Sequence, residues 1–458
     1  MTDIAAAYRK IAAELLKDPD NAEQLASQYT ILSSGPRNPA QLAIARRCAA
    51  VAPNEFIAVF NYASALSRNG ENAIGTFRRA LEIAPPDQRG TTLHHIGLAY
   101  HDQGEYETAL SYYEMARKIA DSRLLGQSIA IAKLACGRLQ EGLYEFEVKH
   151  HLKPRKAISD SGIPWWNGED LTGKTVILTH EQGFGDTLQF IRFAPRLKEW
   201  CKTLIFSGSE PIAPLIAEQF DCFDDVINEV GPFKADFVTS PMAAAALMGL
   251  EYEDVSGEPY MKVEPLKLPA RGKLKVGLSW KGSPGYQNDA LRSASLKDFC
   301  PLFDLPGAAF YSLQVRPGPA EISELGLDGF IADMGSHFTD WRDTAAAIAA
   351  MDVIVATDSA NAHMAGALGV PVMLLLGKNP CWRWMRGDTT PWYDKTKIFR
   401  QEKVDEWPMR QVRSELQRLV STVHSATLAS PKASSPASGI LPKYRSALMT
   451  GAANGSWH

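Results

Sequence analysis

The stretch "DSANAHMAGALG" at 358–369 places an acid, a hydroxyl and an imidazole between two strongly apolar segments. Asp358 and Ser359 open the stretch, and His363 follows among small residues. A helix capped by Asp358 or Ser359 would direct its first backbone N–H groups toward the same place, and such groups favour anions. The pattern therefore fits a cradle for a diphosphate. It fits equally well a helix that packs closely through its small residues, with a buried imidazole.

A second polar turn lies in "THEQGFGDTLQF" at 179–190. Gly183 and Gly185 permit a tight turn with exposed N–H groups near a helix N-terminus, where anions are favoured, and Asp186 is also suited to cap the next helix. The spacing matches neither GxGxxG nor GxxxxGK[ST], which excludes a dinucleotide fingerprint and a Walker loop. His180 precedes the turn and either helps to orient a substrate or is a structural polar residue at a strand end.

Two further polar residues mark the ends of short apolar segments, with Gln314 as the last residue of 310–314. Lys281 comes directly after 276–280 and is expected either to touch a phosphate or to be solvated, and Gln314 is a candidate for contact with a nucleotide. The carboxylate pattern DxD, which often binds a divalent metal ion, occurs only in "DPD" at 18–20, which has the character of a turn. We therefore expect no metal and no other resident cofactor. The 6 cysteines form no CxxC pair and indicate buried thiols in a reducing compartment.

After Lys156 the chain alternates short β-branched segments with helical stretches. The segments are 175–180, 203–208, 276–280, 310–314, 353–357 and 371–376. This alternation predicts an α/β fold with parallel sheets, in which ligands bind at the carboxyl ends of strands. The proline-containing segment 262–273 predicts a linker between two such units. The Ser/Pro/Ala-rich segment 426–458 predicts a disordered tail.

The region before these strands shows the spacing of paired helices. In 91–121, small residues recur where two antiparallel helices must touch, and aromatic residues fill the space around them. The pattern is repeated in 59–85 and more weakly in 126–150, and 41–53 resembles the second helix of a degenerate copy. It closely resembles the tetratricopeptide repeat of about 34 residues. We therefore expect an all-α solenoid over 1–156, with an ordinary helical bundle as the alternative.

The amino-acid composition indicates which classes of partner the chain is expected to lack. The chain has 458 residues, a formal charge of −4 and 22% charged residues, which is typical of a globular protein without a basic footprint for nucleic acid. Its apolar runs are shorter than the about 18 residues that a membrane span needs. The N-terminal segment has an amphipathic pattern and lacks the features of a secretory signal. We therefore expect a cytoplasmic protein with no nucleic acid partner and no membrane span.

Four segments taken together resemble bacterial tetratricopeptide-repeat glycosyltransferases. They are "EQGFGDTLQFIRFAP", "VGLSWKGSPGYQNDALRS", "DTAAAIAAMDVIVATDSANAHMAGALGVPVMLLL" and "CWRWMRGDTTPWYDKTKIFRQ", in this order. The catalytic part is similar to the lipopolysaccharide heptosyltransferases of glycosyltransferase family nine, and the layout is similar to the O-linked N-acetylglucosamine transferases. The resemblance spans about residues 40–425. It implies a GT-B fold, with two Rossmann-like units facing each other across a cleft.

The resemblance also assigns roles to parts of the chain. The unit at 157–268 would face the acceptor, and the unit at 269–425 would hold the nucleotide-sugar. In the family, a loop of the second unit contacts the donor phosphates, and its matching residues here are Asp358, Ser359, Ala360 and His363. Arg292 matches a basic position that neutralises the leaving diphosphate. Gly185 and Asp186 match a turn whose aspartate is the proposed base.

The function implied is a metal-independent, inverting glycosyltransferase that uses a nucleotide-sugar. The helical repeats would recruit a protein whose hydroxyl accepts the sugar, for example flagellin or another surface protein. Transfer to a lipid-linked or polysaccharide acceptor is the alternative among enzymes. A repeat scaffold with a decayed transferase domain is the alternative outside them.

Overall fold

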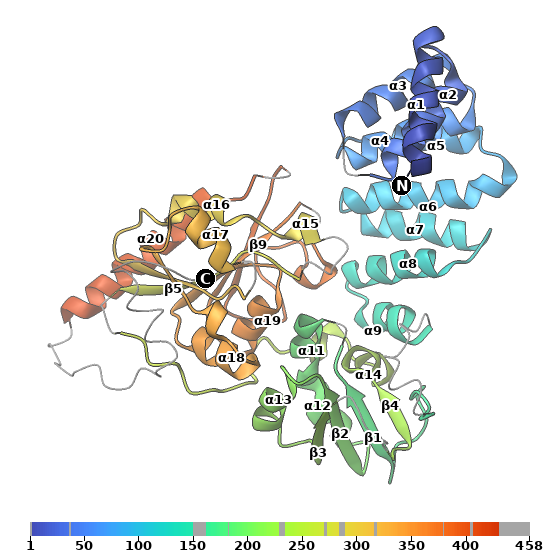
Figure 1. Ribbon diagram of the computed structural model, residues 1–458. Coiled ribbons are helices and arrows are strands. Elements are labelled where there is room, and N and C mark those ends of the chain that lie inside the picture. The colour runs from blue at the N-terminus through green and yellow to red at the C-terminus, as the bar shows by residue number, and fades with distance from the viewer. Residues whose placement is uncertain are drawn as a thin grey trace. The chain divides into compact units, whose positions relative to one another are not determined.

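The computed structural model describes residues 2–35, 38–149, 162–181, 183–228, 234–269, 273–283, 289–315, 318–378, 380–403 and 406–429. The chain forms two compact units, Met1–His150 and His151–His458. The first is entirely helical in its described residues, and the second combines parallel sheets with helices (Figure 1). The expected order of a helical region followed by an α/β region is confirmed.

Consecutive antiparallel helices build the first unit. They are α1 (Thr2–Lys17), α2 (Ala22–Ser33), α3 (Pro39–Val51), α4 (Phe56–Arg68), α5 (Ile74–Glu82), η1 (Pro86–Gln88), α6 (Arg89–Asp102), α7 (Tyr106–Arg117), α8 (Arg123–Ala135), α9 (Leu139–Leu143) and η2 (Tyr144–Lys149). Each α-helix from α1 to α9 packs against the next one along the chain. Gly70, Gly104 and Gly137 follow α4, α6 and α8 with φ values of 72°, 77° and 84°, a conformation that favours glycine. Their spacing is close to the about 34 residues of a tetratricopeptide repeat.

The small residues lie where the sequence pattern requires them. A Cβ atom on Gly97 of α6 would lie 2.3 Å from the Cε1 atom of Tyr113 and 3.1 Å from the carbonyl oxygen of Ala109, both in α7. Only glycine therefore allows α6 and α7 to approach this closely. Gly142 of α9 likewise allows close packing on α8 in the weak third copy, because a Cβ atom there would lie 2.5 Å from the Cγ atom of Leu134.

The first sheet of the second unit has the order β3-β2-β1-β4, and neighbouring strands are parallel. Its strands are β1 (Thr175–Thr179), β2 (Thr203–Gly208), β3 (Asp225–Asn228) and β4 (Phe237–Thr239). The helices of this half are α11 (Phe184–Phe190), η3 (Ile191–Phe193), α12 (Ala194–Lys198), α13 (Ala213–Gln219), α14 (Pro241–Leu247) and η4 (Tyr252–Asp254). Residues 184–198 thus form three short helices in succession, and a proline opens the last of them.

The second sheet has the order β10-β9-β8-β5-β6-β7, again with parallel neighbours. Its strands are β5 (Leu274–Ser279), β6 (Ala308–Ser312), β7 (Ile331–Asp333), β8 (Val353–Thr357), β9 (Val372–Leu376) and β10 (Thr396–Arg400). The helices of this half are α15 (Asp289–Arg292), α16 (Leu296–Phe299), η5 (Cys300–Leu302), α17 (Gly318–Glu324), η6 (Gly335–His337), α18 (Trp341–Ala349), α19 (Ala360–Ala367), η7 (Trp382–Trp384) and α20 (Met409–Ala429). Helix α20 continues past residue 425, where the tail was expected to begin, and 430–458 lies outside the described residues.

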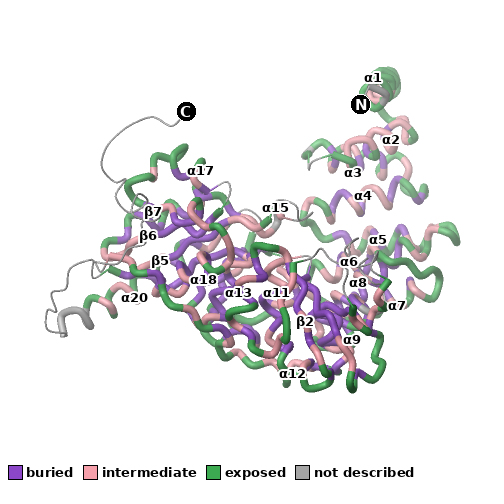
Figure 2. The backbone as a smooth tube through the Cα atoms, turned by 60° about the horizontal axis from the view of Figure 1, so that its bottom comes forward, coloured by how far each residue is buried: buried purple, intermediate pink, exposed green. Residues whose placement is uncertain are grey.

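The core explains why the central strands are apolar. Every residue of β8 and β9 is buried, as expected of strands covered on both faces. Alternate residues of the second sheet, among them Val276, Val353 and Met373, pack with residues of α16, α17 and α20. Helix α19 contacts β8 and β9 and also α11 of the first half. Figure 2 shows buried residues along β2 and around β5 and β6, and exposed residues on α12 and α17.

Within the part of the chain that the structure describes, no helix combines the length and the apolar character that crossing a membrane requires.

Candidate active site

The two polar turns found in the sequence meet where α11 packs against α19. A Cβ atom on Gly185 would lie 2.9 Å from the Cδ2 atom of His363 and 3.5 Å from the Cα atom of Ala360. The glycine therefore lets the backbone of one half approach the helix of the other. Both turns follow the carboxyl ends of central strands, β1 and β8, which is where open parallel sheets bind ligands.

Ser359 precedes α19 in the N-cap position, with an extended backbone at φ −150° and ψ 164°. Its side chain makes no capping hydrogen bond, and its Oγ atom is buried without a hydrogen-bond partner among the described residues. Burying an unpaired hydroxyl is unfavourable, and the first N–H groups of a helix also lack partners within it. A ligand that accepts hydrogen bonds, such as a phosphate, would satisfy both.

Asp358 shares its surroundings with two arginines. Burial raises the pKa of the Asp358 carboxyl above its ordinary value, although the Trp384 side chain and the charges of Arg292 and Arg383 favour the ionised form. The negative charge of Asp186 adds to the increase in pKa. Charged groups from both halves therefore act on one carboxyl beside the N-terminus of α19.

His363 is buried, with only 4% of its surface exposed. Its Nδ1 atom lies 2.9 Å from the Tyr393 hydroxyl, and its ring stacks on Trp384 with 4.9 Å between centroids. Burial lowers the pKa of this imidazole well below its ordinary value, and the neighbouring positive charge of Arg383 adds to this effect. The ring is therefore neutral near pH 7, and any contact with a phosphate would be a hydrogen bond rather than an ion pair.

Asp186 does not cap α11, because Gly183 holds the N-cap position. Its Oδ1 atom forms an ion pair with Nη2 of Arg383 at 2.7 Å. The Asp186 side chain is 35% exposed, whereas the Arg383 side chain is 11% exposed. The Oδ2 atom would lie 2.9 Å from a Cβ on Gly183, so the missing side chain of this glycine leaves room for it.

The sequence analysis missed Arg383, which belongs to η7 of the second half. Its Nε atom donates to Oε1 of Gln189 at 2.7 Å, so the guanidinium contacts α11 at two side chains. The one available signal was its place between two tryptophans in "CWRW". That pattern identifies a packed aromatic loop but not the residue that the arginine would reach.

The loop that carries Arg383 has a strained backbone. Met385 adopts a φ of 49° and a ψ of −159°, a region that non-glycine residues avoid. Nη2 of Arg400 donates to the carbonyl oxygens of Trp384, Met385 and Gly387 at 2.9, 2.7 and 2.9 Å. Such strain persists only where surrounding contacts impose it, and it is most common at functional sites.

Three other predicted residues lie around β5 and β6. Nε of Arg292 donates to Oδ1 of Asp289 at 3.1 Å, and its charge acts on both Asp358 and His363. The ammonium group of Lys281 pairs with Glu321, and the Lys281 backbone N–H donates to Oε1 of Gln314 at 3.0 Å. The charge of Arg292 thus acts on two residues of the predicted site, whereas Lys281 and Gln314 contact each other. Their contacts with a substrate stay predictions.

His180 and Glu181 are buried at the end of β1. Nδ1 of His180 lies 2.6 Å from the Glu181 carbonyl oxygen, and its ring stacks on Phe184. The Glu181 carboxylate accepts a hydrogen bond from the Met242 N–H at 2.7 Å. Burial raises the pKa of Glu181 to about 7, the Met242 hydrogen bond opposes this, and the charge of Asp186 adds to it. The charge of Asp186 thus acts on a buried carboxyl whose pKa is raised.

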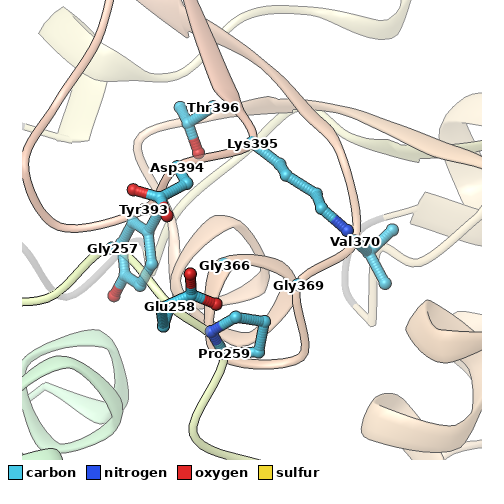
Figure 3. A pocket seen from close by; sticks show the side chains of 10 residues that line it. All are labelled: Gly257, Glu258, Pro259, Gly366, Gly369, Val370, Tyr393, Asp394, Lys395 and Thr396. Carbon is cyan, nitrogen blue, oxygen red and sulfur yellow. The ribbon is translucent and has the colours of Figure 1, made fainter.

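A pocket of about 120 Å³ lies at the other end of α19 (Figure 3). It is lined by Gly257, Glu258, Pro259, Gly366, Gly369, Val370, Tyr393, Asp394, Lys395 and Thr396. None of the predicted site residues lines it, although Tyr393 contacts His363. Across the described ranges of the chain, no three His, Cys, Asp or Glu side chains gather in a way that would hold a metal ion.

Comparison with known proteins identifies the helical part. Residues 55–122 match the tetratricopeptide repeat family. The expected tetratricopeptide repeats are therefore confirmed in this stretch. The weaker copy at 126–150 falls outside the match, although α8 and α9 form there.

Among curated proteins, the chain is similar to FlbA of Caulobacter vibrioides, with 25% identity over 368 residues. The match covers 72% of this chain and 61% of FlbA, so the chain spans about three fifths of that relative's length. Among solved structures, MamA is 22% identical, covers 35% of this chain and 92% of its own, and gives a TM-score of 0.30. The Escherichia coli ADP-heptose lps heptosyltransferase II is 13% identical, covers 56% of this chain and 99% of its own, and gives a TM-score of 0.37.

Proposed function

We propose that this chain is a glycosyltransferase of the GT-B type, which transfers a sugar from a nucleotide-sugar donor to an acceptor hydroxyl. The observation that carries the proposal is the contact of the Gly185 turn with α19. This contact brings Asp186, from one half, close to the unpaired hydroxyl and free helix N-terminus at Ser359, from the other. The resemblance of four sequence segments to family-nine glycosyltransferases points to the same chemistry.

The donor side would stabilise the leaving group. As the bond between the anomeric carbon and the phosphate oxygen breaks, negative charge grows on the nucleotide phosphate. The N–H groups at the start of α19, the Ser359 hydroxyl and the Arg292 guanidinium are suited to stabilise that charge. Because these groups are fixed before the reaction, they need not reorganise during it. Such groups can replace a metal ion in this role, so we propose metal-independent transfer.

The acceptor side would activate the nucleophile. The acceptor oxygen forms a bond to the anomeric carbon, and its proton passes to the Asp186 carboxylate. Attack from the face opposite the leaving phosphate inverts the configuration of that carbon. Asp186 is suited to this role because its side chain is partly exposed and one of its oxygens is already fixed.

The helical unit would supply the acceptor. Stacked tetratricopeptide repeats form an extended concave surface that binds other proteins. We propose that this unit recruits a protein whose serine or threonine hydroxyl receives the sugar. A lipid-linked or polysaccharide acceptor would need no such surface, so the repeats favour the protein.

A donor screen tests the proposal. We expect one class among UDP-, ADP-, GDP- and CMP-sugars to raise the melting temperature of the full-length protein, because a ligand that binds only the folded state stabilises it. The shift should shrink in Arg292→Ala, which removes a charge from the donor side. If every donor leaves the melting temperature of the wild type unchanged at millimolar concentration, the proposed function is wrong.

Chelation tests the metal-independent mechanism. We expect release of nucleotide from the donor identified in the screen to continue at an unchanged rate in 5 mM EDTA, because Arg292 and α19 supply the positive potential. The assay compares untreated, EDTA-treated and magnesium-supplemented protein. Loss of turnover that magnesium or manganese restores would contradict this mechanism.

A further inference from the structure

We propose that Arg383 is a positioning residue that holds Asp186 ready for proton transfer from the opposite half of the second unit. The inference rests on the proposed function, since it assigns a partner to the proposed base. It is carried by the 2.7 Å ion pair between Nη2 of Arg383 and Oδ1 of Asp186. Arg383 acts through Asp186 and is not itself expected to exchange a proton.

The two oxygens of the Asp186 carboxylate have different surroundings. Oδ1 is held by Arg383, whereas Oδ2 lies over Gly183, where any side chain would clash with it. Fixing Oδ1 removes rotation of the carboxylate and leaves Oδ2 to accept the proton. The glycine turn thus makes room for the reactive oxygen, and the arginine orients it.

Arg383 can orient a carboxylate because its own position is fixed. Nε donates to Gln189 at 2.7 Å, Nη1 contacts the Sγ atom of Cys381 at 3.0 Å, and the guanidinium lies 4.4 Å from the Trp382 ring centroid. Two residues after Arg383, the backbone at Met385 adopts a strained conformation with a positive φ. A guanidinium held by a planar fork of hydrogen bonds is more rigid than a lysine would be.

The contact also links chemistry to the arrangement of the two halves. Asp186 and Gln189 belong to α11, whereas Arg383 belongs to η7 of the other half. The carboxylate is therefore aligned only while the two halves are in contact. With the donor bound, the acceptor O–H bond breaks, the oxygen bonds to the anomeric carbon, the nucleotide leaves with its phosphate oxygen, and the proton goes to Oδ2.

A kinetic double-mutant cycle tests the inference on the full-length protein. The reaction is hydrolysis of UDP-glucose, UDP-N-acetylglucosamine, ADP-glucose or GDP-mannose, in which water replaces the acceptor and released nucleotide is measured. We expect Arg383→Met and Asp186→Asn each to lower kcat by roughly 100-fold, as loss of a preorganised contact does. The double variant should be no slower than Asp186→Asn, since residues that act as a unit are not additive.

Two controls separate positioning from general damage. Arg386→Met makes the same substitution at an exposed arginine of the same loop and should keep kcat within about twofold. Arg383→Lys keeps the charge but loses the fork, and should recover only part of the rate. Donor affinity should stay within about threefold in Asp186→Asn and Arg386→Met, and 20 mM guanidinium should partly restore the kcat of Arg383→Ala.

A double-mutant cycle on the melting temperature gives a readout that does not need turnover. If the pair forms, the loss of melting temperature in the double variant is smaller than the sum of the two single losses. Additive losses of both melting temperature and kcat would overturn the inference. If the losses of melting temperature are not additive but the losses of kcat are, the ion pair is purely structural, and the inference is also overturned. A wild type that binds and hydrolyses none of the donors would instead refute the proposed function, and the catalytic role of Arg383 with it.

Discussion

At the scale of single residues, two buried serines show how a site differs from a cap. Ser240 and Ser359 both hold N-cap positions and are 6% and 7% exposed. The Oγ atom of Ser240 accepts a hydrogen bond from the Ala243 N–H at 3.3 Å, whereas that of Ser359 has no partner among the described residues. A buried hydroxyl that stabilises nothing in the folded chain is available to a ligand.

This difference predicts opposite effects of the same substitution. Ser359→Ala should leave the melting temperature of the free protein unchanged or slightly higher, because it removes an unpaired buried group. It should weaken binding of the donor by roughly 10-fold, since the hydrogen bond to the phosphate is lost. Differential scanning fluorimetry and calorimetry measure the two effects.

Ser240→Ala is the matched control, and it should destabilise the protein by about 1 kcal/mol through loss of a cap. A clear fall in the melting temperature of Ser359→Ala, with unchanged affinity for the donor, would show that this serine is structural.

The sequence predicted the candidate site residues only in part. Asp358, Ser359 and Asp186 could be identified because an acid or hydroxyl after a buried strand stands out in a linear pattern. Arg383 could not, because its role depends on a contact between the two halves. Lys281 was ambiguous because Glu321, which pairs with it inside the second half, is distant in sequence.

At the scale of elements, the packing of α11 on α19 depends on one missing side chain. Gly185→Ala would place a Cβ atom 2.9 Å from His363, which is buried and held by Tyr393 and Trp384. We expect the substitution to destabilise the second unit by roughly 1–3 kcal/mol, as overpacking does. Transfer should fall further than stability explains, because the helix that carries Asp186 is displaced.

Gly75→Ala is the control for the loss of a glycine, because nothing lies within 4 Å of a Cβ at this exposed position of α5. It should stabilise the protein by about 0.5–1 kcal/mol, since alanine favours a helix. Both variants can be compared by urea denaturation. An unchanged stability of Gly185→Ala would contradict the close approach of the two helices.

The elements that the sequence predicted well are the buried ones. The predicted segments 203–208 and 353–357 coincide with β2 and β8. The sequence analysis missed β3, β4, β7 and β10, each of which lies at the edge of its sheet. The residues of β3 are exposed or partly buried, and β4 and β7 have three residues each. A strand at the edge of a sheet has one neighbour, so its sequence carries less of the signal that burial imposes.

At the scale of the whole molecule, buried histidines make stability depend on pH. His94 lies in the first unit and is 8% exposed. Burial lowers the pKa of His94 to about 4, with a smaller contribution from the charge of the neighbouring His95. The unfolded chain has the ordinary value of 6.5, so as pH falls the unfolded state binds the proton first. Stability is therefore retained above pH 6.5 and lost toward pH 4, by about 3 kcal/mol.

Denaturation by urea between pH 7 and pH 4 measures this loss, and His94→Gln should reduce it. Carboxylates also titrate in this range, so the comparison is between the slopes of the variant and the wild type. Equal slopes would show that His94 does not contribute.

The division of the chain into two units predicts which functions can be separated. Removing residues 1–150 deletes the whole helical unit and leaves both sheets and all predicted site residues intact. We expect residues 151–458 to fold and to keep the increase in melting temperature caused by the donor, because a compact unit carries its own core. Hydrolysis of the donor should also persist, since Asp186, Arg383 and the Ser359 loop all remain.

Transfer to protein should be lost, because the truncated chain no longer recruits an acceptor. The measurement is incorporation of radiolabelled sugar into acid-precipitable protein of an extract from the producing cells, with full-length protein as the reference. Equal incorporation by both proteins would refute recruitment by the repeats and favour an acceptor that binds the α/β unit directly. If hydrolysis and donor binding disappear together with transfer, then the helical unit is needed for the fold of the second unit, and the two functions are not separable.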